Sequence, residues 1–222
     1  NPGFRQALDT LRDAHIEQLI VLPLFPQFSA TSTGPLYDQL GDWVKLQRNL
    51  PGLHVVRDYH VHPAYVTALA ESIRAHWASY GRADKLLFSF HGIPQPYADK
   101  GDPYPDQCRA TARAVVAELG LAEGEWEQSF QSRFGLQEWV KPYTDKLLET
   151  WGHDGVASVQ VLCPAFSADC LETLEEIAVE NHDEFIKAGG KCYEYIPALN
   201  ASPAHVELFV SLLQGPVQAM RR

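Results

Sequence analysis

The chain has 222 residues, of which 45% are hydrophobic and 21% are charged, and its formal net charge is −10. This composition is typical of a soluble globular protein, and the length suffices for one large domain or for one domain and part of another. The negative charge argues against nucleic acid as the main partner, and no apolar stretch approaches the roughly 20 residues that span a bilayer. Four scattered cysteines without a CxxC pair indicate thiols of a reducing compartment rather than a disulfide framework or a zinc site.

The expected elements alternate between helices and short apolar strands along the whole chain. In chain order they are a helix at 4–14, a strand at 18–24, a helix at 35–50, a strand at 53–57, a helix at 63–80, a strand at 85–90, a helix at 106–119, a strand at 125–130, a helix at 141–151, a strand at 156–162, a helix at 171–186, a strand at 192–196 and a last helix at 203–213. Strands that are separated by helices pair in parallel, with helices on both faces of the sheet. The fold class is therefore expected to be α/β, with functional groups in the loops that follow strands.

Three loops that directly follow expected strands are of interest, at 26–33, 91–102 and 164–169. In the second loop, His91 comes directly after an apolar run, and Pro94 and Pro96 prevent any regular continuation of the strand. Because ligands bind at the carboxyl ends of strands in open α/β sheets, His91 is a candidate active-site residue. The alternative is a loop histidine without a chemical role, and its position alone does not decide between the two.

The third loop opens a helix in which acidic residues recur at i, i+4 and i+8, at Glu172, Glu176 and Glu180. These carboxylates line one face of the helix and repel one another. Asp169 and Glu172 have the spacing of a capping box, which explains Glu172 but neither of the other two. A solvated acidic face and a path for cations are therefore both open. A histidine that faces several carboxylates suits Fe(II), Mn(II), Mg(II) or Zn(II).

Aromatic side chains are frequent in or beside the loops that follow strands. They are Phe25, Phe28, Tyr97, Tyr104, Phe130, Phe134, Trp139 and Phe166. Most are expected in the core, but a cluster at the ligand edge of the sheet suits a large, flat, apolar ligand.

Four motifs occur in order along the chain: PQFSATSTG at 26–34, SFHGIP with GDPYP at 89–94 and 101–105, SFQSRFG with WxxP at 129–135 and 139–142, and CPAFSADCLETLEEI at 163–177. Together they resemble the ferrochelatase family, which inserts Fe(II) into a porphyrin in the last step of haem synthesis. The resemblance covers essentially all 222 residues.

The resemblance implies a chelatase-like fold of two Rossmann-type lobes, with parallel sheets flanked by helices. Residues 1–34 are expected to be a remnant of the N-terminal lobe and residues 35–202 the C-terminal lobe. Residues 203–222 are expected to form a C-terminal helix that packs back on the first lobe. Family members are longer at the N-terminus, so the first lobe is expected to be incomplete and one wall of the cleft to precede Asn1.

The resemblance also implies roles for individual residues. His91 is the active-site histidine, which accepts pyrrole protons or contacts the metal, and Glu172 is its acidic partner across the cleft. The residues implied to contact the metal are His91, Glu172, Glu176 and Glu180, the last two in a helix with a widened, π-type turn. The residues implied at the porphyrin pocket are Trp139, Phe166 and Asp169.

The expected function is that of a ferrochelatase, a lyase that inserts ferrous iron into protoporphyrin IX to form protohaem in the cytoplasm. Iron is its substrate, and no iron–sulfur cluster is expected because the cysteine spacing fits no cluster pattern. The alternatives are coproporphyrin as the substrate, or a haem- or metal-binding module without catalysis if the N-terminal part is truly absent. A periplasmic-type binding domain would need an export signal, which the sequence does not show. Oligomeric state and peripheral membrane association are left open.

Overall fold

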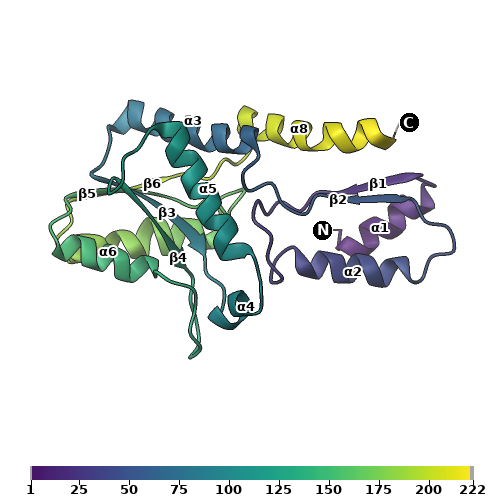
Figure 1. Ribbon diagram of the computed structural model, residues 1–222, viewed down its shortest axis with the longest axis horizontal. Helices are drawn as coiled ribbons and strands as arrows, with labels where there is room; N and C mark the ends of the chain where they lie inside the picture. The colour runs from purple at the N-terminus through teal and green to yellow at the C-terminus, as the bar shows by residue number, and fades with distance from the viewer. Residues whose placement is uncertain (1, 221–222) are drawn as a thin grey trace.

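The computed structural model describes residues 2–220 and contains two parallel β-sheets (Figure 1). The smaller sheet pairs β1 (Gln18–Val21) with β2 (Gly52–Val55), and the larger sheet has the strand order β4-β3-β5-β6. The strands of the larger sheet are β3 (Lys85–His91), β4 (Trp126–Gln131), β5 (Ser158–Leu162) and β6 (Cys192–Ile196). All strand pairs within residues 2–220 are parallel, which confirms the α/β class.

The smaller sheet forms one group of elements with α1 (Phe4–Asp13) and α2 (Gly34–Val44), on the right in Figure 1. Their shared core consists of Leu8, Leu19, Leu40 and Trp43. The expected boundary between the lobes at residues 34 and 35 is therefore wrong. Residues up to 55 belong with the first group, because β2 pairs with β1 and α2 contributes to the same core.

Helices cover both faces of the larger sheet, and the side chains of β3 alternate between two cores. Phe88 and Phe90 face the core that contains α3 (Pro63–Tyr80) and α5 (Tyr104–Leu119). Leu87 faces the other core, which contains α6 (Thr144–His153) and α7 (Asn181–Lys187). This alternation is the two-residue period of a strand that is buried on both faces, as expected for a central parallel strand.

The C-terminal helix α8 (Pro203–Met220) packs on α3 and also reaches β1, so it contacts both groups of elements (Figure 1). This helix was expected to pack on the first lobe, and its contact with β1 agrees with that. Its interface with α3, in the second group of elements, is the larger of the two. Residue 1 of the expected first lobe and residues 221 and 222 of the expected C-terminal helix lie outside the described residues. No helix within residues 2–220 combines the length and apolar character required to cross a bilayer.

The acidic helix begins as a π-helix, η1 (Glu172–Glu180), and continues as α7. The predicted π-type turn is therefore confirmed and extends over nine residues. Its hydrogen bonds join residues five apart, so each turn holds more than the about 3.6 residues of an α-helix. Side chains at i, i+4 and i+8 consequently stay more closely in line than they would on an α-helix.

Candidate active site

The carboxyl ends of β3, β4 and β5 meet at one edge of the larger sheet. The loops that follow β3 and β5, together with segments 25–35 and 134–139, line a cavity of about 690 Å³. Its walls are mainly apolar and aromatic. The volume lies within the range of roughly 300 to 1,000 Å³ that is typical of pockets for organic ligands and cofactors.

His91 ends β3 and lies on the wall of this cavity, half-buried. Its Nδ1 lies 2.7 Å from the carbonyl oxygen of Gly92, so in the neutral imidazole Nδ1–H donates and Nε2 keeps its lone pair. The imidazole and the ring of Phe166 have centroids 6.3 Å apart. His91 is thus oriented by the backbone and has one nitrogen available as a proton acceptor or a metal ligand.

Glu172 lines the same cavity, although it lies 81 residues further along the chain, in the first turn of η1. A hydrogen bond with the Cys170 thiol, assisted by the backbone N–H of Glu172 and by the nearby His91, lowers the pKa of the Glu172 carboxyl. The carboxylate is therefore ionised at neutral pH. The predicted pairing of a histidine and a carboxylate on one cavity corresponds to this placement.

Trp139 forms part of the wall beside His91 and is 4% exposed. Its Nε1–H donates to the carbonyl oxygen of Phe134 at 2.9 Å, and its backbone forms an antiparallel bridge with Pro94. A Cβ atom at Gly92 would lie 2.9 Å from the carbonyl oxygen of Gln131 and 3.0 Å from Cε3 of Trp139. Glycine at this position therefore allows the indole to pack directly against the backbone that follows His91.

Phe166 lines the cavity as expected, whereas Asp169 does not. The Asp169 carboxylate instead accepts hydrogen bonds from the Tyr195 hydroxyl at 2.7 Å and from Nδ2 of Asn200 at 2.8 Å. It also accepts a bond from Oγ1 of Thr173 at 3.2 Å. Burial raises the pKa of Asp169, but these donors outweigh burial and hold the pKa below its ordinary value. Through these hydrogen bonds, Asp169, in the loop after β5, is linked to β6, to the loop after β6 and to the start of η1.

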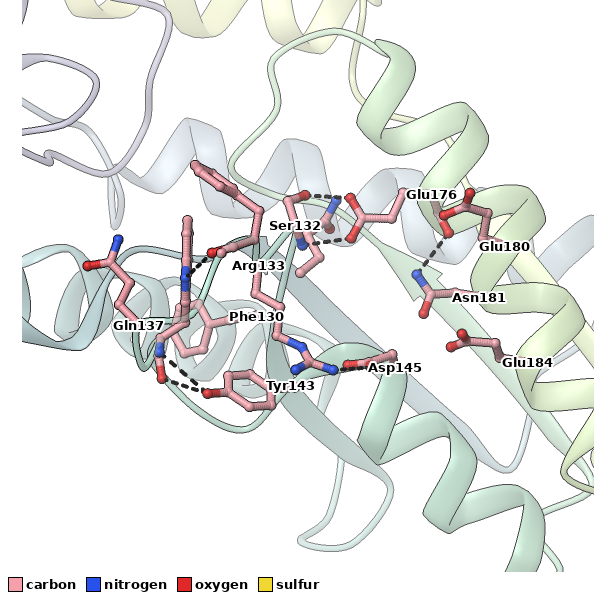
Figure 2. Close-up of a pocket in the computed structure, with 14 residues that line it drawn as sticks. Phe130, Ser132, Arg133, Gln137, Tyr143, Asp145, Glu176, Glu180, Asn181 and Glu184 are labelled. Atoms are coloured by element: carbon pink, nitrogen blue, oxygen red, sulfur yellow. Dashed lines mark hydrogen bonds and ion pairs between the residues drawn. The ribbon is translucent and has the colours of Figure 1, made fainter.

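Glu176 and Glu180, two of the other acids of the π-helix, line a second, polar cavity of about 380 Å³ (Figure 2). Asp145 and Glu184 add to its acidic character. Three residues line both cavities and form the partition between them: Phe134, Gln137 and Trp139. Within residues 2–220, no three His, Cys, Asp or Glu side chains are grouped so as to hold a metal ion. The acidic row is therefore divided, with Glu172 on the larger cavity and Glu176 and Glu180 on the smaller one.

Two residues with structural consequences for the cavities were not singled out from the sequence. Ser132, which follows β4, donates both its backbone N–H and its hydroxyl to the carboxylate of Glu176. Asp102 accepts hydrogen bonds from the Ser29 hydroxyl and the Ala30 N–H, both at 2.8 Å. Asp102 lies in the GDPYP motif, and nothing in the sequence indicates partners more than 70 residues away.

Comparison with known proteins agrees with the motifs. A family model described as Ferrochelatase matches residues 1–215. The ferrochelatase of Psychrobacter arcticus is 59% identical over 212 residues, which are 96% of this chain and 62% of that protein. The ferrochelatase of Acinetobacter baumannii is 58% identical over 220 residues, which are 99% of this chain and 65% of that protein. The chain thus spans less than two thirds of the length of these relatives.

A solved structure with a similar fold is SirB from Bacillus subtilis with Fe3+, which has a TM-score of 0.70 and 10% sequence identity. The similarity covers 95% of this chain and 76% of that one, and at this identity it bears on the fold alone. The fold is therefore chelatase-like. Together with the family model and the relatives, the match over nearly the whole chain shows that this chain belongs to the ferrochelatase family.

Proposed function

We propose that this chain carries a ferrochelatase active site, which inserts Fe(II) into protoporphyrin IX to form protohaem. The observation that carries the proposal is the placement of His91 and Glu172 on the wall of one aromatic cavity. Family membership indicates the reaction class, and this geometry provides the groups that the reaction needs. The native partners are a porphyrin and ferrous iron, both as substrates, and the cytoplasm is the proposed location.

The reaction exchanges two pyrrole protons for one divalent cation, so charge is conserved when both protons leave. His91 is the proposed acceptor for these protons, because Nε2 keeps its lone pair while Nδ1–H is held by the Gly92 carbonyl. The ionised Glu172 stabilises the imidazolium that forms and the incoming cation by charge. Loss of the protons to solvent restores His91 for the next insertion.

The aromatic wall has a separate role, which is to hold the macrocycle. Trp139 and Phe166 supply flat apolar surface on the cavity that also holds His91 and Glu172. A rigid wall of this kind favours a bent ring, in which the nitrogen lone pairs point towards the metal. The orientation of the ring against His91 accounts for part of the rate.

The polar cavity is the proposed approach for cations. Among the described residues it is lined by four acids, Asp145, Glu176, Glu180 and Glu184, and by one base, Arg133, which is paired with Asp145. The negative potential of such a surface raises the local concentration of cations. Iron reaches Glu172 and His91 as a substrate, and the absence of an iron–sulfur cluster remains a prediction.

The test is insertion of Fe(II) or Zn(II), followed by porphyrin absorbance, with protoporphyrin and coproporphyrin in parallel. The full-length Psychrobacter relative is the positive control and the His91→Ala variant the negative one. Insertion that depends on His91 supports the proposal, and the preferred porphyrin identifies the substrate. Porphyrin binding without insertion would instead indicate a non-catalytic binding module.

A further inference from the structure

We propose that Glu176 is a positioning residue, which fixes the partition between the two cavities by holding Ser132. The residues of the partition, Phe134, Gln137 and Trp139, belong to the segment 133–139, which follows β4. The effect of the contact between Glu176 and Ser132 on porphyrin binding rests on the proposed function, whereas the contact itself does not. Glu176 thus acts on the aromatic cavity although its side chain lines the polar one.

The contact between Glu176 and Ser132 uses both oxygens of the carboxylate. Oε1 accepts the Ser132 backbone N–H at 2.6 Å, and Oε2 accepts the Ser132 hydroxyl at 2.5 Å (Figure 2). Two parallel hydrogen bonds to an ionised acceptor are among the stronger polar contacts in proteins and also fix direction. The residue that follows β4 therefore binds the Glu176 carboxylate, whereas no side-chain hydrogen bond is found for Glu175 within residues 2–220.

The backbone of Ser132 indicates that this contact is needed. Its φ is 63°, in the left-handed region that residues other than glycine rarely adopt. Such a conformation persists when its surroundings hold it in place. The segment 133–139 follows directly and belongs to the loop that projects beyond the end of β4 in Figure 1.

The segment has few other anchors near its beginning. Phe134 is 71% exposed, and the side chain of Leu136 is fully exposed. Arg133 forms a surface ion pair with Asp145 at 2.5 Å, and surface pairs contribute little to stability. Local opening is easiest where few apolar contacts are buried. Arg133 also stacks on the Tyr143 ring, 4.5 Å from its centroid. The bonds from Ser132 to Glu176 restrain the backbone at the start of the segment, ahead of the hydrogen bond between Trp139 and Phe134.

The consequence for the aromatic cavity follows from the hydrogen bond that joins Trp139 and Phe134. The Trp139 indole Nε1–H donates to the Phe134 carbonyl oxygen at 2.9 Å. Movement of the segment therefore displaces Phe134 and Trp139 together. Both line the aromatic cavity. Loss of the hold at Ser132 is therefore expected to weaken porphyrin binding without removing any group that contacts the metal.

The hold can be measured by limited proteolysis, because Arg133 is the tryptic site in this segment and Lys141 is followed by proline. In Glu176→Gln, the amide NH₂ faces one of the two Ser132 donors, and in Ser132→Ala the hydroxyl bond is lost. Each variant is expected to raise the rate of cleavage after Arg133 by at least about fivefold, the effect of losing one charge-assisted hydrogen bond. Rates are normalised to cleavage of the corresponding synthetic peptides, and Glu175→Gln is the matched control.

The double variant Glu176→Gln/Ser132→Ala separates a shared contact from two independent effects. If the two residues act through the same contact, the double variant is cleaved little faster than the faster single variant. Full additivity, or a cleavage rate for Glu176→Gln equal to that of the wild type, would overturn the proposal. This measurement needs neither porphyrin nor metal, so its outcome is independent of the proposed function.

Porphyrin titration by fluorescence, together with the metal KM, then tests the functional consequence. We expect Glu176→Gln and Ser132→Ala to weaken porphyrin binding by a similar factor, and we expect Ser132→Ala, which keeps every carboxylate of the polar cavity, to leave the metal KM unchanged. If Glu176 acts only on cations, Glu176→Gln raises the metal KM and Ser132→Ala behaves as the wild type, which would also overturn the proposal. Absence of porphyrin binding by the wild-type chain would contradict the proposed function and leave the proteolysis result standing.

Discussion

At the scale of single residues, the candidate site consists of two groups whose states are set by their nearest neighbours. The Gly92 carbonyl fixes the proton of His91 on Nδ1, and the Cys170 thiol helps to keep Glu172 ionised. A proton acceptor and a fixed negative charge consequently share one cavity. A nitrogen lone pair and a negative charge on one cavity are what a proton-removing site requires.

Substitution of either group is expected to lower the rate of metal insertion more than it lowers porphyrin affinity. His91→Ala and Glu172→Gln should each reduce kcat by at least about 10²-fold, the low end for loss of a general base. Glu180→Gln should reduce kcat only about tenfold, because water and neighbouring carboxylates can replace it in the polar cavity. The measurement is insertion kinetics for the three variants, with porphyrin titration in parallel. Near-normal kcat in both His91→Ala and Glu172→Gln would refute the site assignment.

At the scale of elements, hydrophobic patterning predicted all six strands and most helices near their observed bounds. The apolar run that ends at His91 is β3, and its two buried faces explain why the run is continuous. Patterning could not predict which strands pair, because pairing depends on packing between distant segments. The assignment of β2 to the second lobe is wrong for that reason.

For the site residues too, the sequence does not indicate contacts between distant segments. The position of His91 after an apolar strand made it a candidate, and the family resemblance implied its pairing with Glu172. The family resemblance implied Asp169 at the pocket, but the direction of its side chain is set by donors on other elements, including Tyr195 and Asn200. The left-handed turn at Ser132 has no local signal, because the sequence places no glycine or asparagine there.

Asp169→Asn is expected to destabilise the junction of the β5 loop, the β6 loop and η1 at neutral pH. The folded-state pKa of Asp169 lies below its ordinary value of 3.8, so its contribution is present above that pH and is lost as the pH falls below it. Because the carboxylate is partly exposed, we expect a loss of about 1 kcal/mol in the free energy of unfolding at pH 7. The difference from the wild type should shrink towards pH 3.

Urea unfolding of the wild type and Asp169→Asn at several pH values between 7 and 3 measures this difference. Asp38→Asn, at an exposed position on α2, is the matched control. A difference that stays constant over this pH range would mean that the charge of Asp169 does not contribute to folding stability.

At the scale of the whole molecule, the aromatic cavity is bounded by segments from both groups of elements. The loop after β1 crosses to the second group, where the Phe28 N–H donates to Oε1 of Gln107 at 2.7 Å. In the same region, Nε2 of Gln27 donates to Oγ1 of Thr111 at 3.0 Å. Gln27 also lines the cavity. The position of this wall therefore depends on polar contacts with α5 as well as on the first group itself.

Asp102 is the acidic member of this junction, and Asp102→Ala is expected to weaken both folding and porphyrin binding. One carboxylate oxygen accepts the Ser29 hydroxyl and the Ala30 N–H, and the other accepts the Tyr104 N–H at 3.0 Å, in the first turn of α5. Loss of these bonds should reduce the free energy of unfolding by about 2 kcal/mol. Porphyrin affinity should fall as well, because Ser29 lies on the cavity wall and loses its fixed position.

The matched control is Asp106→Ala, on the first turn of the same helix. The Asp106 side chain is 82% exposed and pairs only with Arg109 among the described residues, at 2.6 Å. This substitution should change the free energy of unfolding by less than about 0.5 kcal/mol and leave porphyrin binding unchanged. Urea unfolding and porphyrin titration measure the stability and the porphyrin affinity of Asp102→Ala and Asp106→Ala. If Asp102→Ala unfolds and binds porphyrin as Asp106→Ala does, then Gln27 and Gln107 hold the wall without Asp102. If only stability falls, Asp102 serves the start of α5, and the cavity wall does not depend on it.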